Sequence, residues 1–198
     1  MRVAAGLGLL LFSIPLAAQE VSAVNYRALT GEERWDYYIE RTFRRPEVYL
    51  RSGALALADQ SGDNPPEWQQ GVDGFGRRMA SRFGTGSVRV ATEAAAAAAL
   101  GQDPRYVSCG CDGTWNRVKH ALTATLLTYN SHGERTFASA RVGAAYASGM
   151  ATLTWYPDRY GWKDGMRQGT QIVIAGGLAN LLREFAPDLK RKVFGKRH

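Results

Sequence analysis

Hydrophobic positions recur every three or four residues through most of the chain, which is the spacing of one face of an α-helix. The clearest example steps through Phe75, Met79, Phe83, Gly86, Val90, Ala94 and Ala97. This pattern predicts one long helix, and the alanine run at 94–99 favours it because alanine has the highest helix propensity. Gly101 is the candidate C-cap, and Asp103-Pro104 is expected to stop the helix.

Five other segments with helical spacing predict helices at 30–45, 47–59, 115–129, 137–155 and 166–185. Thr30 and Glu33 predict a capping box at the start of the first one. Its buried face is expected to carry Trp35, Tyr38, Ile39 and Phe43. Pro187 is expected to interrupt the last helix, and a short basic helix is expected to resume at Asp188. No segment shows a convincing strand alternation, so the sequence predicts an all-α fold of about six helices, packed as a bundle through Ala/Gly-rich faces.

Residues 1–18 have the form of a secretory signal peptide, with Arg2 followed by an apolar stretch and cleavage expected after Ala18. The alternative is an uncleaved anchor, but the apolar run is shorter than the ~20 residues that span a bilayer. The two other apolar segments, residues 142–156 and 172–182, are also shorter than that. The sequence therefore predicts export to the periplasm or cell envelope. The expected organisation after the leader is a loose lead-in (19–29), a single helical domain (30–189) and a basic C-terminal tail (190–198).

The charge of the chain is concentrated at its C-terminus. The formal net charge is +7, from 25 Lys and Arg against 18 Asp and Glu. Five of the positive residues lie in the tail: Lys190, Arg191, Lys192, Lys196 and Arg197. Because export makes nucleic acid an unexpected partner, the tail is expected to contact an anionic membrane surface or a cell-wall polymer. The alternative is a solubilising end that also suits the helix dipole. No protein partner is indicated.

The only two cysteines form the motif Cys109-Gly110-Cys111. In an exported protein they are expected to be oxidised, and so small a disulfide ring is expected to be easily reduced. The motif therefore suggests a thiol redox site or, with Asp112 and His120, a site for a soft metal. The alternative is a simple loop staple or a pair of thiols without a function, because the spacing matches no standard zinc pattern.

The chain contains no nucleophile elbow, paired-histidine helix, phosphate loop or dinucleotide fingerprint, so no catalytic residue and no cofactor are predicted. Glu93 beside the alanine run is a candidate general acid for a small hydrolase, but a solvated helix face is the simpler expectation. Among the aromatic clusters, Tyr160 and Trp162 are the candidates for surface binding, by stacking on sugars or lipid headgroups.

Six short segments contain motifs at helix boundaries and turns, at 30–43, 65–71, 74–78, 103–106, 156–158 and 184–188. Together they resemble a family of exported, mostly helical bacterial proteins with no assigned activity. Members of that family have other residues where this chain has Cys109 and Cys111, which argues against a shared cysteine mechanism. The leading hypothesis is a non-enzymatic exported envelope protein, attached to a membrane surface through its basic end. A thiol redox or metal-binding module is the alternative, followed by a small envelope hydrolase.

Overall fold

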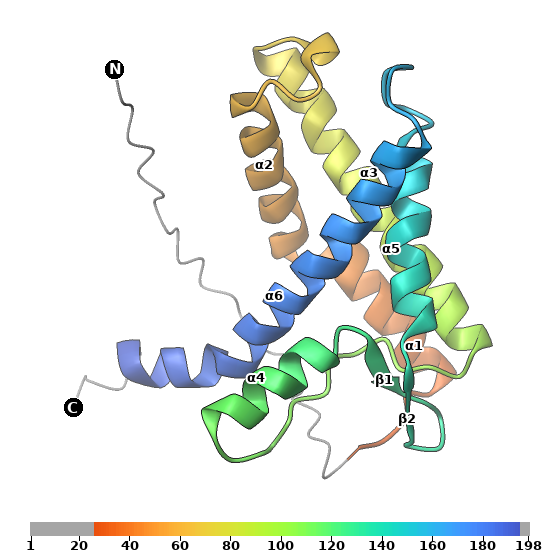
Figure 1. The fold of residues 1–198 in the computed structure, drawn as a ribbon, viewed down its shortest axis with the longest axis vertical. Helices are drawn as coiled ribbons and strands as arrows, with labels where there is room; N and C mark the ends of the chain where they lie inside the picture. The colour runs from red at the N-terminus through yellow and green to blue at the C-terminus, as the bar shows by residue number, and fades with distance from the viewer. Residues whose placement is uncertain (1–25, 195–198) are drawn as a thin grey trace.

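The computed structural model describes residues 26–194, and six α-helices make up most of that segment (Figure 1). They are α1 (Gly31–Ile39), α2 (Pro46–Ser61), α3 (Val72–Ala99), α4 (Thr114–Thr123), α5 (Ser139–Thr152) and α6 (Trp162–Phe194). A π-helical turn (Glu40–Arg44) continues α1, and a 3-10 turn (Pro66–Trp68) precedes α3. The predicted all-α fold is confirmed.

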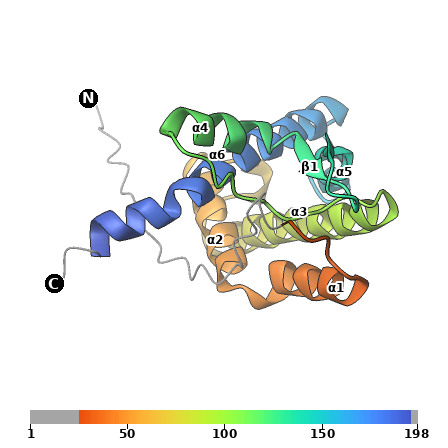
Figure 2. The ribbon, with the colours of Figure 1, turned by 90° about the horizontal axis from the view of Figure 1, so that it is seen from below.

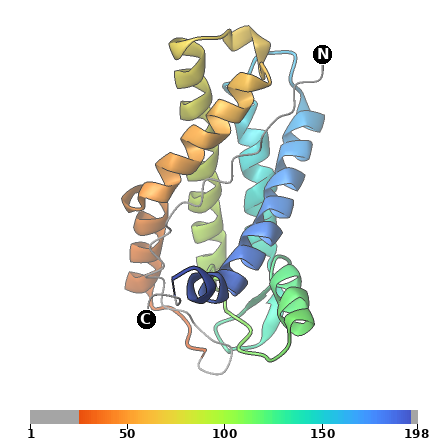
Figure 3. The ribbon, with the colours of Figure 1, turned by 90° about the vertical axis from the view of Figure 1, so that its left-hand side faces the viewer.

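Four helices pack in the order α2, α3, α5 and α6, so that each contacts the next. Helix α6 crosses in front of α3 and α5 in Figure 1, and α4 packs on α6. Seen from below, α1 and α4 lie on opposite sides of α3 (Figure 2). The view from the left-hand side shows α2 and α6 as the two outer members of the layer, with α3 between them (Figure 3). Helix α3 is therefore covered on several sides.

Small residues form the contacts between the central helices, as predicted. Ala97 of α3 and Ala144 of α5 are both buried. Gly149 of α5 lies against α6 so closely that an added Cβ would be 2.3 Å from the carbonyl oxygen of Gly165 and 2.9 Å from the amide nitrogen of Gly169. Glycine at position 149 therefore permits an approach of the two backbones that no larger residue allows.

A β-hairpin, which the sequence pattern did not predict, connects α4 to α5. Strands β1 (Leu127–Tyr129) and β2 (Arg135–Phe137) pair antiparallel. The helix predicted over 115–129 consequently ends at Thr123, and the one predicted over 137–155 runs only over Ser139–Thr152. The chain reverses because the Asn130 side-chain oxygen accepts hydrogen bonds from the amides of His132 and Glu134, both at 2.9 Å.

The predicted buried face of α1 is wrong for Trp35 and Phe43, while Tyr38 and Ile39 are half-buried. Trp35 is 62% exposed and Phe43 is 46% exposed, and no residue of α1 is buried. The side of α1 that faces the domain is polar instead: Arg34 donates to the Gln102 carbonyl at 2.8 Å, and the Tyr37 hydroxyl donates to the Pro104 carbonyl at 3.4 Å. The capping box of Thr30 and Glu33 is present as predicted.

Both ends of the described segment differ from the sequence prediction. Helix α6 continues through Pro187 instead of stopping there, and its axis changes direction towards its C-terminal end (Figure 1). A proline inside a helix removes one backbone donor and crowds the preceding turn, which bends the axis. At the other end, the Tyr26 ring stacks on Tyr129 with centroids 4.9 Å apart, so this part of the predicted lead-in lies against the hairpin. The predicted leader, residues 1–18, falls outside the described residues.

Candidate functional site

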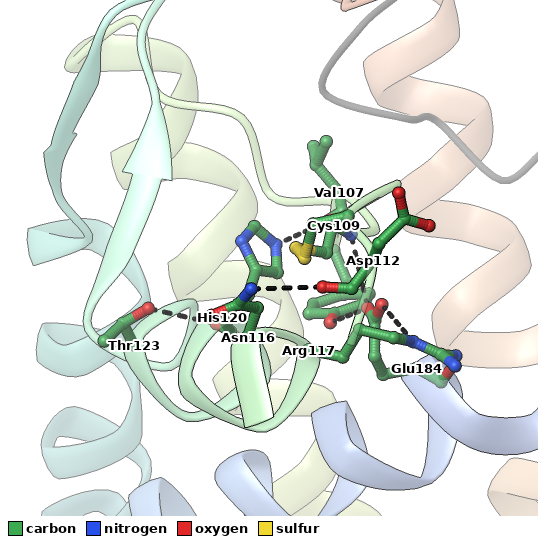
Figure 4. Close-up of a disulfide and its surroundings, with 10 residues drawn as sticks. Val107, Cys109, Asp112, Asn116, Arg117, His120, Thr123 and Glu184 are labelled. Carbon is green, nitrogen blue, oxygen red and sulfur yellow. Dashed lines mark hydrogen bonds and ion pairs between the residues drawn. A yellow bond between two sulfur atoms is a disulfide. The ribbon is translucent and has the colours of Figure 1, made fainter. Parts of the chain in front are cut away.

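The two cysteines are joined by a disulfide in the loop that follows α3 (Figure 4). The backbone amide of Cys109 donates to Glu184 Oε2 at 3.3 Å, and the Tyr106 hydroxyl donates to the same oxygen. Glu184 belongs to α6 and is buried. The disulfide loop is therefore attached to α6 through one carboxylate.

Helix α4 binds the same carboxylate through Arg117. Its Nε donates to Glu184 Oε1 at 3.3 Å, and its Nη1 donates to Asp188 Oδ2 at 2.5 Å. Burial raises the pKa of the Tyr106 hydroxyl, and the hydrogen bond to Glu184 raises it further. Glu184 thus accepts from three groups and acts as an anchor. The sequence reasoning missed it, although Asn180, Glu184 and Asp188 recur every four residues, the spacing of one helix face.

The other two candidates near the disulfide, His120 and Asp112, point to different partners. His120 Nε2 lies 2.8 Å from the Val107 carbonyl oxygen, so the ring is bonded to the backbone of the loop. The Asp112 side chain is turned away from His120 in Figure 4, and its backbone carbonyl accepts from Asn116 at 3.1 Å. Between residues 26 and 194, no group of three or more His, Cys, Asp or Glu side chains is placed to hold a metal ion. The structure does not assemble the suggested metal site.

The prediction that Glu93 lies on a solvated helix face is wrong. Its residue exposure is 1%, and its carboxylate accepts from Arg41 Nη1 at 3.2 Å, Arg89 Nη1 at 3.1 Å and Arg141 Nε at 3.3 Å. Burial alone would raise the pKa of Glu93, but the three arginines hold it below its usual value. The carboxylate is therefore ionised and holds no proton to donate as a general acid. Two of its partners come from other helices, which a single-helix pattern cannot reveal.

The two candidate surface aromatics differ in exposure. Trp162, the first residue of α6, is 64% exposed, and the Lys163 ammonium lies 5.9 Å from the centre of its ring. Tyr160 is half-buried; its hydroxyl donates to Asn64 Oδ1 at 3.1 Å and accepts from Arg159 at 2.7 Å. Of these two candidates, Trp162 is the one whose ring is largely exposed to solvent.

The basic end begins inside α6. Arg191 is exposed and forms an ion pair with Asp188. The side chains of Lys190 and Lys192, and all of Lys196 and Arg197, lie outside what the structure describes. Their predicted contact with an anionic surface stays a prediction.

Helix α6 also carries an exposed apolar stripe, defined here as Ile174, Leu178, Leu182 and Leu189. These side chains are 60%, 58%, 62% and 52% exposed. The opposite side of the helix contains the residues that pack on α5 and α4, including Gly169 and Asn180. The sequence reasoning missed the stripe because apolar residues occupy both sides of this helix.

No family model, curated protein or solved structure matches the chain. Among the helices within residues 26–194, none is long and apolar enough to cross a membrane.

Proposed function

We propose that this protein is a non-enzymatic, exported protein of the cell envelope that attaches to an anionic membrane surface through the apolar stripe of α6. The exposure of the stripe is the observation that carries the proposal. Helix α6 is apolar both on the side that faces the domain and on the side that carries the stripe. Helices α4 and α5 bury the first side, and the stripe stays exposed. Exposed apolar patches of this kind mark partner or membrane surfaces.

Charge at both ends of the stripe favours an anionic bilayer as the cover. Arg167 precedes the stripe with 72% of its side chain exposed, and Arg191 follows it with 79% exposed; each also forms an ion pair with the aspartate three residues before it, Asp164 and Asp188. The remaining lysines and arginine of the tail come next in the sequence. An apolar face with basic residues beside it is typical of helices that lie in the membrane interface.

We expect the protein to bind the membrane surface weakly and reversibly. Complete burial of a Leu or Ile side chain is worth about 1.5–3 kcal/mol, so four side chains that are a little over half exposed offer roughly 4 kcal/mol. Each basic residue near an anionic surface adds about 1 kcal/mol, and salt screens that part. We therefore expect binding that weakens as the salt concentration rises.

Vesicle flotation tests the proposal with a matched pair of variants. The test variant is Leu178→Asp/Leu182→Asp, and the control is Leu57→Asp, which alters a leucine on α2 that is 60% exposed. We expect the native protein and the control to float with phosphatidylglycerol vesicles and not with phosphatidylcholine vesicles. The double variant is expected to stay in the soluble fraction.

Two results would overturn this proposal. One is equal flotation of the double variant and the native protein. The other is a native protein that does not float and elutes as a dimer that Leu178→Asp/Leu182→Asp dissociates, because the stripe would then be an interface between two copies. Light scattering after size-exclusion chromatography distinguishes the second case.

A thiol redox function is the second candidate, and the disulfide between Cys109 and Cys111 is the observation that favours it. Both cysteines are half-buried, so a small reductant has partial access to the bond. Thiol titration of the native fold, with and without reductant, tests it. We expect two titratable thiols after reduction, and no thiol in either state would exclude the function.

A further inference from the structure

A small pocket lies between α1 and α3, against the buried carboxylate of Glu93. Helix α1 contributes Arg34 and Tyr37 to its wall, the π-helical turn contributes Arg41, and α3 contributes Glu93 itself. The spacing of three and four residues places the first three on one side of the helical segment, and Arg41 Nη1 donates to the Tyr37 hydroxyl at 3.4 Å. The pocket therefore brings together two guanidinium groups, one hydroxyl and one carboxylate.

The wall of the pocket holds more positive than negative charge. Three arginines share the single negative charge of Glu93: Arg41, Arg89 and Arg141. Within residues 26–194 none of the three forms an ion pair with a second carboxylate, so two positive charges are left unbalanced. Arg34 adds another, because the one hydrogen bond of its side chain in the described part of the chain goes to a backbone carbonyl, at 2.8 Å.

Burial makes this excess of positive charge costly. The side chains of Arg41, Arg89 and Arg141 are only 21%, 14% and 21% exposed. Burial and the neighbouring charge of Arg41 lower the pKa of Arg89 to about 9, despite its bond to Glu93. A positive charge that has few water contacts and no partner of its own gains free energy when an anion binds beside it. The charge of the wall thus favours an anion in the pocket.

The same residues have hydrogen-bond donors to offer an anion. Arg34 and Arg41 each donate through Nη1 alone to acceptors within residues 26–194, so the Nε and Nη2 of both remain for a ligand. The Tyr37 hydroxyl donates to the Pro104 carbonyl and accepts from Arg41, both at 3.4 Å, which is longer than the usual range of about 2.7–3.2 Å. That hydroxyl can therefore turn to a closer acceptor.

The size of the pocket limits which anion it can take. Its volume is about 10 Å³, which is about the room that one water molecule needs. Val90 and Ala94 complete part of the wall and offer no side-chain hydrogen bond. Phosphate, sulfate and carboxylate ions are larger than this volume and need more donors. A chloride ion carries one negative charge and is close to a water molecule in size, so it suits both the volume and the charge.

We propose that this pocket binds one chloride ion, with Arg34, Tyr37 and Arg41 as its ligands. The ion offsets positive charge that Glu93 leaves unbalanced, and it joins α1 to α3 across an interface whose α1 side is polar. The ligands lie outside the apolar stripe of α6, so the site does not depend on membrane attachment.

Thermal unfolding at constant ionic strength, with sodium chloride replacing sodium gluconate, tests the proposal. A ligand that binds only the folded protein raises the melting temperature, so we expect a rise of roughly 3–5 °C for each tenfold increase in chloride above the Kd. Arg34→Gln should need at least about tenfold more chloride for the same rise, because it lacks one charge-assisted donor. The matched control is Arg44→Gln, which removes an exposed arginine of the π-helical turn outside the pocket and should respond like the native protein.

Sodium acetate in place of sodium chloride tests the size limit. Acetate has the same charge in a larger ion, so we expect a much smaller rise in melting temperature. Equal effects of acetate and chloride would overturn the proposal. It would also be overturned by a native protein whose melting temperature does not depend on chloride, or by an Arg34→Gln variant that responds like the native protein. If Arg34→Gln does not fold, Tyr37→Phe, which removes only the hydroxyl, decides the question in the same titration.

Discussion

Replacement of Glu93 by glutamine is expected to destabilise the domain strongly. The variant keeps the shape of the side chain and removes the negative charge that three arginines share at 3.1–3.3 Å. Those arginines are themselves mostly buried, with 14–21% of each side chain exposed. Removing one partner of a buried ion pair costs about 3–5 kcal/mol because the other charge is left without compensation.

The expected loss is large compared with the total stability of a domain. Folded domains are stable by about 5–15 kcal/mol, so 3–5 kcal/mol is a substantial part of that. For a chain of this size each kcal/mol corresponds to about 2–4 °C, which gives a fall in melting temperature of roughly 6–20 °C. Urea denaturation followed by far-UV circular dichroism measures the free energy, and a thermal scan measures the temperature.

The control for Glu93→Gln is Asp158→Asn, which removes one negative charge from an exposed residue between α5 and α6. Asp158 has no ion pair or hydrogen bond within the described part of the chain, so we expect a change below about 0.5 kcal/mol. A second substitution, Arg89→Gln, added to Glu93→Gln should recover part of the loss because it removes one uncompensated cation. The reasoning fails if Glu93→Gln and Asp158→Asn change the stability by similar amounts.

The other predictions concern pH, the disulfide and the glycine contact. Because the folded pKa of Glu93 lies below its unfolded value of about 4.3, its stabilisation is complete above that pH and is lost as the pH falls through the folded pKa. Urea midpoints of the native protein should therefore fall more steeply than those of Glu93→Gln below about pH 5. Cys109→Ser/Cys111→Ser should cost only about 1.5 kcal/mol in urea denaturation, because a three-residue ring constrains the unfolded chain little; a loss above about 4 kcal/mol would contradict this. Gly149→Ala should destabilise the domain by about 1–3 kcal/mol through overpacking, and so lower the melting temperature. Gly143→Ala, on the same helix, places its methyl group in open space and should not lower the melting temperature. Equal melting temperatures for the two alanine variants would refute the close-contact argument.

The sequence predicted the helical fold because its periodic segments are long. The helices around Phe75–Ala97 and over 47–59 correspond to α3 and α2 within a few residues at each end. The hairpin was missed because each strand has three residues, which is too short for an alternation to be recognised. The β-prone residues Thr128 and Tyr129 fall inside the helix predicted over 115–129 instead.

The charged contacts inside the domain could not be predicted in the same way. Periodicity reports which side of one helix is apolar, and it carries no information about a partner that is distant in sequence. Glu93 is 52 residues from Arg41 and 48 residues from Arg141, and only Arg89 lies one helical turn away. The same limit applies to Glu184, whose partners Tyr106 and Arg117 are 78 and 67 residues distant.

The order of helices in the layer has a kinetic consequence. Helices α2 and α3 are adjacent in sequence, as are α5 and α6, and each pair is in close contact. Such local pairs close short loops, which helical domains do quickly. The bonds that join one pair to the other, such as Arg141 to Glu93, span long stretches of chain and are expected to form later. We therefore expect two helical hairpins to assemble first, and the long-range ion pairs of Glu93 with Arg41 and Arg141 to form after them.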